Sequence, residues 1–326
     1  MTPLYLGLDG GGTKTAAAAV DADGRVRGLS RAGPSTFKSL GLPIAADVLA
    51  GLAAEAAGKD RVGVLVAGVA DVDTAADRDA LQAALRSAVL ARGLAVERLE
   101  VVNDSVIALA SGTRGLARGI ACIAGTGSVA FGVNRAGREG RAGGWGPPFA
   151  DGGSAYWIGF QAVGRALKLH DRGQAEAPLV GELLAASGCS TLAELLYDYL
   201  GAGGQAGVAR DRLPALARAV EAAARAGDAD ARAIFAAAGL ELAELVGVLV
   251  GRLGMAGESF DLVTVGGVWG TSAPTFQASF SAELARIAPG ARTTGPSVEP
   301  AVGAALLARE LGARGGSCPA GLLGSV

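Results

Sequence analysis

The chain has almost no histidine and little cysteine. It holds one histidine, His170, and three widely separated cysteines, Cys122, Cys189 and Cys318. These counts disfavour a polyhistidine zinc site or an iron facial triad, and the cysteine spacing suits neither a disulfide framework nor a metal centre. We expect buried, inert cysteines and a surface histidine at a helix end. A general base in this protein is then most simply a carboxylate.

Charge of one sign and long apolar runs are also scarce. The 29 Lys and Arg residues nearly balance the 31 Asp and Glu residues, the net charge is −2, and no dense basic block occurs. The pattern predicts no binding to nucleic acid or to an anionic membrane. Apolar stretches such as 245–250 are shorter than the roughly 20 residues of a membrane span, and residues 1–3 lack the features of a signal peptide. We therefore expect a cytoplasmic protein that binds small molecules.

Glycine, in contrast, is abundant, with 52 residues, and the most informative run is Asp-Gly-Gly-Gly-Thr-Lys-Thr at 9–15. Apolar segments at 4–8 and 16–20 flank this run and predict β-strands. Glycines allow positive φ angles in the turn, and the exposed N–H groups of successive peptides suit an anion such as phosphate. The run is not a P-loop, because Thr13 rather than glycine precedes Lys14 and a strand follows. A plain glycine-rich hairpin is the alternative.

A second passage of the sequence repeats this plan. Predicted strands at 119–124 and 129–133 are joined by the turn Gly-Thr-Gly-Ser at 125–128. Internal repeats usually correspond to repeated structural units. We therefore expect two similar halves whose glycine turns grip a polyphosphate from both sides, in a chain long enough for two lobes.

Strands and helices alternate between the two repeats. A strand at 62–66 and a helix at 74–91 are followed by a strand at 99–102, which runs into Asn103 and Asp104 ahead of another helix. This alternation predicts a largely parallel sheet, in which functional groups gather at the carboxyl ends of the strands. Asp104 lies at such an end.

The second half is largely helical in pattern. A glycine- and proline-rich loop at 143–148 precedes a helix that ends near Lys168, and the block 176–255 is predicted to be a helical insertion with breaks at 201–204 and 227–228. The remaining predictions are a strand at 262–265, helices at 274–287 and 299–311, and a frayed end at 315–326.

Five blocks, spread over the chain in one order, resemble the N-acetylglucosamine kinases within the BadF/BadG/BcrA/BcrD group of the actin/hexokinase/Hsp70 superfamily. The most distinctive block runs from Trp145 to Trp157. The others are 9–15, 103–104, 125–128 and Gly-Gly-Val-Trp at 266–269.

The resemblance implies an α/β protein with a two-lobed ribonuclease-H-like, or actin-like ATPase, fold. The βββαβαβα core would be duplicated, with one copy in each lobe and the helical insertion in the second lobe. The implied division is an N-terminal lobe at 1–113, a C-terminal lobe at 114–298, and a last helix with its tail at 299–326 that returns to the first lobe. A homodimer is also implied, and the block at 176–255 is a candidate interface.

The resemblance also implies roles for individual residues around ATP and Mg²⁺. The catalytic base would be Asp104, and Asp9 would hold Mg²⁺ through water, as is typical of this cation. The ATP-binding residues would be Gly11, Gly12, Thr13, Lys14, Thr126, Gly127, Ser128, Gly266 and Gly267. The residues in contact with an amino sugar would be Thr36, Asn103, Asp104, Gly144, Trp145, Gly146 and Asp151.

The implied chemistry agrees with the residue types. Phosphoryl transfer needs aligned reactants and stabilised charge on the phosphate oxygens, and an aspartate can accept the proton of the sugar 6-hydroxyl. Some roles have simpler alternatives. Asp104 and Asp151 each precede a helix and could be its N-cap, and Trp145 could pack in the core.

One departure from the family pattern leaves the sugar open. The loop at 33–38 has no asparagine where sugar-binding relatives carry one, and Thr36 offers one hydroxyl in place of an amide. Glucosamine or another hexose therefore stands beside N-acetylglucosamine. An alternative of another class is an ATPase that drives electron transfer in a partner enzyme, which the three scattered cysteines disfavour.

Overall fold

An antiparallel meander followed by two parallel strands forms the first sheet of the protein. The computed structural model describes residues 3–200 and 212–323. In it the strands take the order β3-β2-β1-β4-β5. All eight residues of β4 are buried, which fits a central strand with helices on both faces. The strands are β1 (Leu4–Gly10), β2 (Thr15–Val20), β3 (Val26–Ala32), β4 (Val62–Val69) and β5 (Val96–Asn103).

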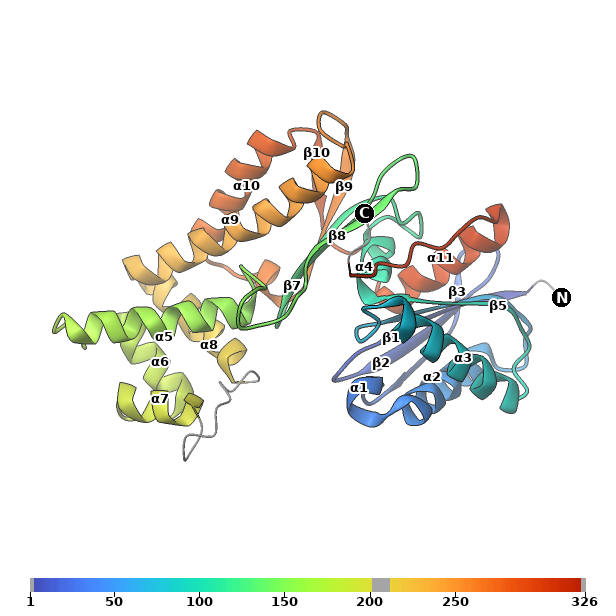
Figure 1. Ribbon diagram of the computed structural model, residues 1–326, viewed down its shortest axis with the longest axis horizontal. Helices are drawn as coiled ribbons and strands as arrows, with labels where there is room; N and C mark the ends of the chain where they lie inside the picture. Colours follow the sequence, from blue (N-terminus) through green and yellow to red (C-terminus); the bar gives the residue numbers. More distant parts are fainter. Residues whose placement is uncertain (1–2, 201–211, 324–326) are drawn as a thin grey trace.

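The helices of the first lobe lie on opposite faces of this sheet. Helices α2 and α3 share an apolar cluster with one face, while α4 packs on the other (Figure 1). Helix α3 begins with a capping box between Thr74 and Asp77, at the boundary that the sequence predicts. The helices are α1 (Phe37–Leu40), α2 (Leu42–Ala57), α3 (Ala75–Ala91) and α4 (Asp104–Gly112).

A second sheet repeats the first. Its order, β10-β9-β6-β7-β8, again places the first strand of the unit at the centre, the antiparallel meander on one side and two parallel strands on the other. The duplicated ribonuclease-H-like fold is therefore confirmed. The strands are β6 (Gly119–Ala124), β7 (Ser128–Val133), β8 (Glu139–Gly143), β9 (Phe260–Val265) and β10 (Ala291–Thr294).

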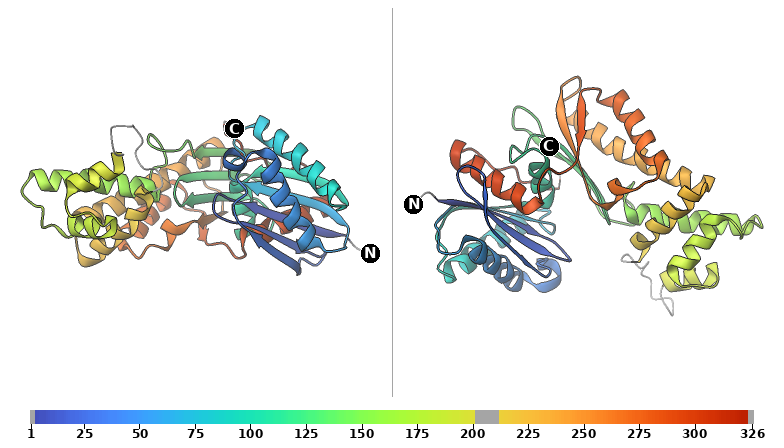
Figure 2. Two further views of the ribbon diagram at one scale, coloured as in Figure 1. Left: turned by 90° about the horizontal axis from the view of Figure 1, so that it is seen from below. Right: turned by 180° about the vertical axis from the view of Figure 1, so that it is seen from behind.

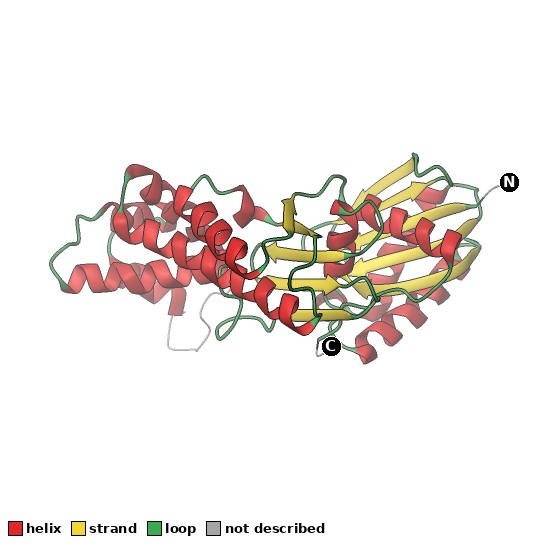
Figure 3. Ribbon diagram, turned by 90° about the horizontal axis from the view of Figure 1, so that it is seen from above, coloured by secondary structure: helices red, strands yellow, loops and turns green. Residues whose placement is uncertain are grey.

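Within the described residues, five helices lie between β8 and β9; the last four fall in the block 176–255 that the sequence predicts to be a helical insertion. They lie at the end of the molecule far from the N-terminus (Figure 3). Gly227 ends α8 in the left-handed conformation and Asp228 caps α9, whereas the break predicted at 201–204 lies outside the described residues. The helices are α5 (Ala155–Asp171), α6 (Pro178–Ser187), α7 (Leu192–Leu200), α8 (Leu213–Ala226) and α9 (Ala229–Arg252).

Helix α9 is long and apolar enough, by length and composition, to cross a membrane. Its buried residues belong to the core of the second lobe, together with those of α10 (Pro274–Ile287). Half of its apolar window is buried there, as in a core helix of a folded lobe.

Two helices occupy the space between the sheets. Helix α4 and α11 (Pro300–Arg314) share one apolar cluster with residues of both sheets, among them Val66 of β4 and Phe131 of β7. Helix α11, in red, lies against the first lobe in the view from behind (Figure 2). It packs so closely on β1 that a Cβ atom at Gly7 would overlap the carbonyl oxygen of Ala301. This packing fixes the position of α4 between the lobes.

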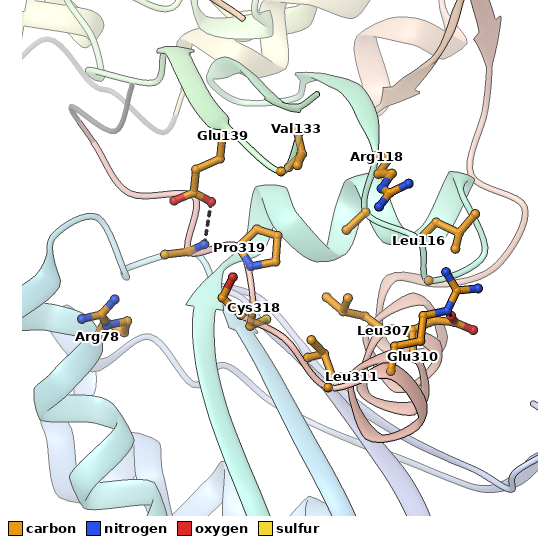
Figure 4. A pocket seen from close by; sticks show the side chains of 17 residues that line it. Arg78, Leu116, Arg118, Val133, Glu139, Leu307, Glu310, Leu311, Cys318 and Pro319 are labelled. Carbon is orange, nitrogen blue, oxygen red and sulfur yellow. Dashed lines mark hydrogen bonds and ion pairs between the residues drawn. The ribbon is translucent and has the colours of Figure 1, made fainter. Parts of the chain in front are cut away.

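The C-terminal tail differs from its prediction. Over 315–323 it is not frayed, because its backbone is bonded to both lobes. The Ala320 N–H donates to Glu139 Oε2 of β8 at 2.8 Å (Figure 4). The Asn103 N–H donates to the Ala320 carbonyl at 2.9 Å, and the Leu323 N–H donates to the Asp73 carbonyl at 2.8 Å. Apolar periodicity carries no signal for such backbone bonding.

The structure tests the predicted exposure of the histidine and the predicted burial of the cysteines. His170 lies exposed in the last turn of α5, as expected. Cys122 is buried, and burial raises its pKa to about 12. Cys189 and Cys318 are partly buried, so they meet the expectation of burial only in part, although burial raises the pKa of Cys318 to about 12 as well.

Candidate active site

The first glycine turn is exposed and is braced by the loop after β3. Residues 12–14 are exposed, while the Ser35 N–H donates to the Gly11 carbonyl at 3.1 Å. Thr15 Oγ1 donates to the Gly33 carbonyl at 2.8 Å. This places Thr36 beside the turn, since a Cβ atom at Gly12 would lie 3.7 Å from the Thr36 methyl group. The predicted phosphate-binding turn and the predicted sugar-contacting loop are thus neighbours.

The second glycine turn is held by the start of α5. The Ala155 and Tyr156 N–H groups donate to the carbonyls of Gly125 and Thr126 at 2.9 and 3.2 Å. The Thr126 side chain is exposed and open to a ligand. Ser128 Oγ instead donates to the Gly152 carbonyl at 2.8 Å, so its hydroxyl already supports the fold. A phosphate contact from Ser128 therefore remains a prediction, which this bond does not favour.

The predicted adenosine motif lies against the second turn. Gly266 has a φ of 110°, and a Cβ atom there would overlap the backbone of Ala124, so only glycine allows this approach. A short 3-10 helix, η1 (Gly267–Gly270), follows. Next to it lies a cavity of about 540 Å³, within the range of ligand pockets. It is lined by Gly125, Thr126, Gly267, Val268, Thr271 and side chains of α5, α8 and α9.

Helix α8 contributes a wall that sequence reasoning missed. Pro214, Ala217, Arg218 and Glu221 line the cavity from this helix. Glu221 accepts hydrogen bonds from both the N–H and the hydroxyl of Ser272, each at 2.6 Å, and these bonds lower its pKa below the usual range against the effect of burial. The block 176–255 therefore takes part in the site, although an alanine-rich helix carries no motif that indicates a ligand.

Trp269 holds the predicted adenosine motif in place through a hydrogen bond and ring contacts. Its indole N–H donates to the Cys122 carbonyl at 3.0 Å, and its ring meets Phe276 and Phe280 edge to face. These contacts anchor the adenosine motif to β6 and α10.

Asn103, not Asp104, caps α4. Asn103 Oδ1 accepts from the Ser105 N–H at 3.1 Å and from the Ser105 hydroxyl at 2.6 Å. Its amide Nδ2 donates to the Val72 carbonyl at 3.0 Å. The predicted sugar contact of Asn103 is therefore not favoured, because its side chain is 2% exposed and engaged at both ends. The N-cap alternative for Asp104 is therefore wrong.

Two acidic groups share one electrostatic environment. Burial raises the pKa of Asp104, the Arg141 guanidinium opposes this rise, and the charges of Asp73 and Asp71 add to it. The pKa of Asp9 is raised from 3.8 to about 6 by burial and by the charge of Asp104, against the opposing effect of Lys14. A cation at Asp9 would relieve this repulsion, so the carboxylate fits a Mg²⁺ held largely through water. No cluster of three or more potential metal ligands occurs within 3–200 and 212–323.

The glycine- and proline-rich loop bends toward the second turn. Gly143, Gly144, Gly146 and Asp151 all have positive φ angles. The Gly146 N–H donates to Asp151 Oδ1 at 3.2 Å. The space beside Gly127 is filled by the Asp151 carboxylate, since a Cβ atom there would lie 2.5 Å from Oδ2.

The alternatives for this loop are also resolved. Ser154 caps α5 by accepting from the Trp157 N–H at 3.2 Å, so Asp151 is not the cap. Trp145 is 71% exposed, so core packing is wrong for it. An exposed indole beside a buried carboxylate is an arrangement that suits a sugar.

Comparisons with known proteins agree with this geometry. A model of the BadF/BadG/BcrA/BcrD ATPase family matches residues 6–308. The chain is 33% identical over 269 residues to the N-acetylmuramic acid/N-acetylglucosamine kinase of Clostridium acetobutylicum, covering 81% of this chain and 84% of that one. It is 29% identical over 327 residues to the N-acetyl-D-glucosamine kinase of Dictyostelium discoideum, covering 94% and 97%. A Chromobacterium violaceum structure, named as a candidate N-acetylglucosamine kinase, has a TM-score of 0.68 at 23% identity over 94% and 99% of the two chains.

Asp9 leads to a pH-dependent prediction for the metal-free protein. Because folding raises its pKa to about 6, the free energy of unfolding falls as the pH rises through about 4 to 6 and stays lower above that range. Asp9→Asn should therefore raise the stability by about 2 kcal/mol near pH 8 in EDTA, with no gain near pH 4. Urea unfolding at both pH values measures this, with Glu55→Gln on the exposed face of α2 as control. An equal effect at both pH values would contradict the prediction.

The cavity beside η1 leads to a second prediction. Ala217→Trp on α8 should fill the space and weaken the binding of a non-hydrolysable ATP analogue by about tenfold or more. Ala215→Trp is the matched control, because Ala215 is exposed on the same helix and does not line the cavity. Isothermal titration calorimetry compares the variants. If the two substitutions have the same effect on affinity, the nucleotide does not lie in this cavity.

Proposed function

Because the chain belongs to the BadF/BadG/BcrA/BcrD ATPase family, we propose that it is a sugar kinase that transfers the γ-phosphoryl group of ATP to the 6-hydroxyl of N-acetylglucosamine. The observation that carries this proposal is the carboxylate of Asp104, which lies at the start of α4 without being its N-cap. Arg141, one of the charges that act on it, donates to the Gly144 carbonyl in a loop that the family pattern assigns to the sugar. The kinase names of the relatives support the same class of reaction.

In this mechanism Asp104 accepts the proton of the sugar hydroxyl while the hydroxyl oxygen forms a bond to the γ-phosphorus. The bond from that phosphorus to the bridging oxygen breaks, which leaves ADP and the sugar 6-phosphate. The raised pKa of Asp104 brings its basicity closer to neutral pH, where a general base is most effective. The first glycine turn with Lys14 and the second turn with Thr126 would hold the phosphates, and the cavity beside η1 would hold the nucleoside.

Mg²⁺ would neutralise charge on the β- and γ-phosphates. Asp9 would hold it, and its raised pKa reflects the negative charge that a cation would balance. Lys14 is exposed in the adjacent turn, from which it can reach a phosphate as well.

The amino sugar is proposed to lie between the loop at 33–38 and the loop at 143–151. Asp151 and the exposed Trp145 would contact it from the second lobe, and Thr36 from the first. Thr36 is 8% exposed and cannot replace both the donor and the acceptor of an asparagine amide. Glucosamine is therefore the alternative substrate.

An activator of an electron-transfer enzyme is less well supported as a function. Such proteins would need a cysteine-bound cluster, whereas Cys122 is buried in the second lobe and Cys318 lies in the tail. We also propose a cytoplasmic homodimer, in which the helical insertion is the candidate interface. Analytical ultracentrifugation tests the assembly.

An ADP-release assay over a panel of sugars tests the proposed function. The panel should include N-acetylglucosamine, glucosamine, N-acetylmannosamine, N-acetylmuramic acid and glucose. We expect N-acetylglucosamine to give the highest kcat/KM, and the product to carry its phosphate on the 6-hydroxyl by ³¹P NMR. If none of the sugars stimulates ADP release, the proposed kinase activity is wrong.

Asp104→Asn tests the base. The amide keeps the shape of the side chain but cannot accept the proton, so kcat should fall by about two orders of magnitude. Affinity for the ATP analogue should stay within about twofold, because the nucleotide does not contact this residue in the proposed arrangement. Asp23→Asn, in the exposed turn between β2 and β3, is the control. Turnover near the wild-type rate would remove the assignment.

A further inference from the structure

One arginine is buried where the two lobes meet. Arg141 lies on β8 of the second lobe, and its side chain is only 6% exposed. A buried guanidinium is costly unless its donors are bonded and its charge is paired. The hydrogen-bond and ion-pair partners of Arg141 therefore indicate why an arginine is buried at this position.

The partners of Arg141 come from three separate segments. Nη1 forms an ion pair with Asp73 Oδ1 of the first lobe at 3.1 Å. Nη1 also donates to the Gly321 carbonyl of the tail at 3.3 Å, and Nη2 donates to the Gly144 carbonyl at 3.3 Å. The guanidinium thus joins the loop at 143–151, the first lobe and the tail.

Asp73 extends this connection to the other side of the proposed sugar site. Its second oxygen, Oδ2, accepts from Lys38 Nζ at 2.8 Å. The Lys38 N–H donates to Asp71 Oδ2 at 2.9 Å, which fixes the segment just after Thr36. Lys38, Asp73 and Arg141 therefore form one ionic chain, which we call the brace, between the two sugar-contacting loops.

The brace also reaches the proposed base. Arg141 is the cation that opposes the effect of burial on the pKa of Asp104, while the negative charges of Asp73 and Asp71 add to that effect. The charge of Asp104 in turn raises the pKa of Asp9. The tail connects the brace and the proposed base physically as well. The Ala320 carbonyl accepts from the N–H of Asn103, the residue before Asp104, and the next carbonyl, that of Gly321, accepts from Arg141.

One donor of Arg141 is left unused. Within 3–200 and 212–323, its Nε is the buried side-chain nitrogen or oxygen that has no hydrogen-bond partner. Buried polar groups in folded proteins are nearly always bonded, so an unpaired one calls for an explanation. A donor retained for an oxygen of the closed, sugar-bound site supplies one.

We propose that Arg141 is a positioning residue of the kinase reaction, which locks the loop at 143–151 and the tail against the first lobe through Asp73. This inference rests on the proposed function and adds to it, because no motif of the family resemblance includes Arg141, Asp73 or Lys38. The planar fork of arginine reaches two segments at once, which a lysine cannot do.

Steady-state kinetics over a range of pH tests the proposal. Arg141→Gln should lower kcat and raise the KM for the sugar, each by about tenfold or more, with the KM for ATP within about twofold. The acid limb of kcat/KM should move to higher pH, because loss of the positive charge raises the pKa of Asp104. Arg141→Lys should restore the limb but not the sugar KM, since it retains the charge and loses the fork.

Asp73→Asn separates the two roles of the brace. It should raise the sugar KM in the same direction as Arg141→Gln, because the bridge between lobes is weakened. The acid limb should move to lower pH, because a negative charge near Asp104 is removed. The effects of the two substitutions on the sugar KM should be less than additive in the double variant. Arg138→Gln is the control, since Arg138 is exposed and bonds to the Arg252 carbonyl.

Hydrogen exchange provides a readout that does not depend on turnover. In Arg141→Gln, the amides of Ala320 and Leu323 should exchange at least about tenfold faster than in Arg138→Gln. Unchanged exchange together with an unshifted acid limb would overturn the proposal. So would a uniform loss of kcat at every pH with an unchanged sugar KM, which is the result of a structural role alone. If the wild type phosphorylates no sugar, the proposed function fails, while hydrogen exchange still decides whether the brace exists.

Discussion

The capping of α4 by Asn103 decides what Asp104 can do. A helix that starts at the end of a strand needs an acceptor for its first N–H groups, and Asn103 provides it with its side-chain oxygen. The adjacent carboxylate of Asp104 is then not needed as the cap of this helix. The cap itself is held by the Val72 carbonyl and by the tail at Ala320. The position of the proposed base therefore depends on backbone contacts from two distant segments of the chain.

The sequence predicts those parts of the fold and site that depend on local backbone chemistry. The two glycine turns, the strands around them and the helical insertion follow from glycine placement and apolar periodicity, and the strand order then repeats in both lobes. Asp104 and Asp151 could be singled out from their positions after a strand and within a rigid loop. Whether each was a helix cap depended on where the helix begins, and the structure places the cap one residue before Asp104 and three residues after Asp151.

The features that could not be predicted all depend on tertiary contacts of residues without a motif. Ala217 becomes part of a cavity only because α8 packs beside η1. The tail at 315–323 has the composition of a loose end, and its order comes from backbone bonds to Asn103, Asp73 and Glu139. Arg141 stands in a short strand, and its role depends on an aspartate 68 positions earlier in the chain.

The electrostatics of the cleft explain why these contacts matter for a kinase. Asp9 and Asp104 each raise the energy of the other in its ionised form, which costs stability in the absence of ligands. A cation at Asp9 would offset this repulsion at one carboxylate, and the guanidinium of Arg141 offsets it at the other, Asp104. Arg141 comes from the second lobe and its partner Asp73 from the first, so their ion pair depends on the relative position of the lobes. In the proposed mechanism, the contact that holds the loop at 143–151 would also support Asp104 in proton transfer, and so couple the geometry of the lobes to the chemistry between them.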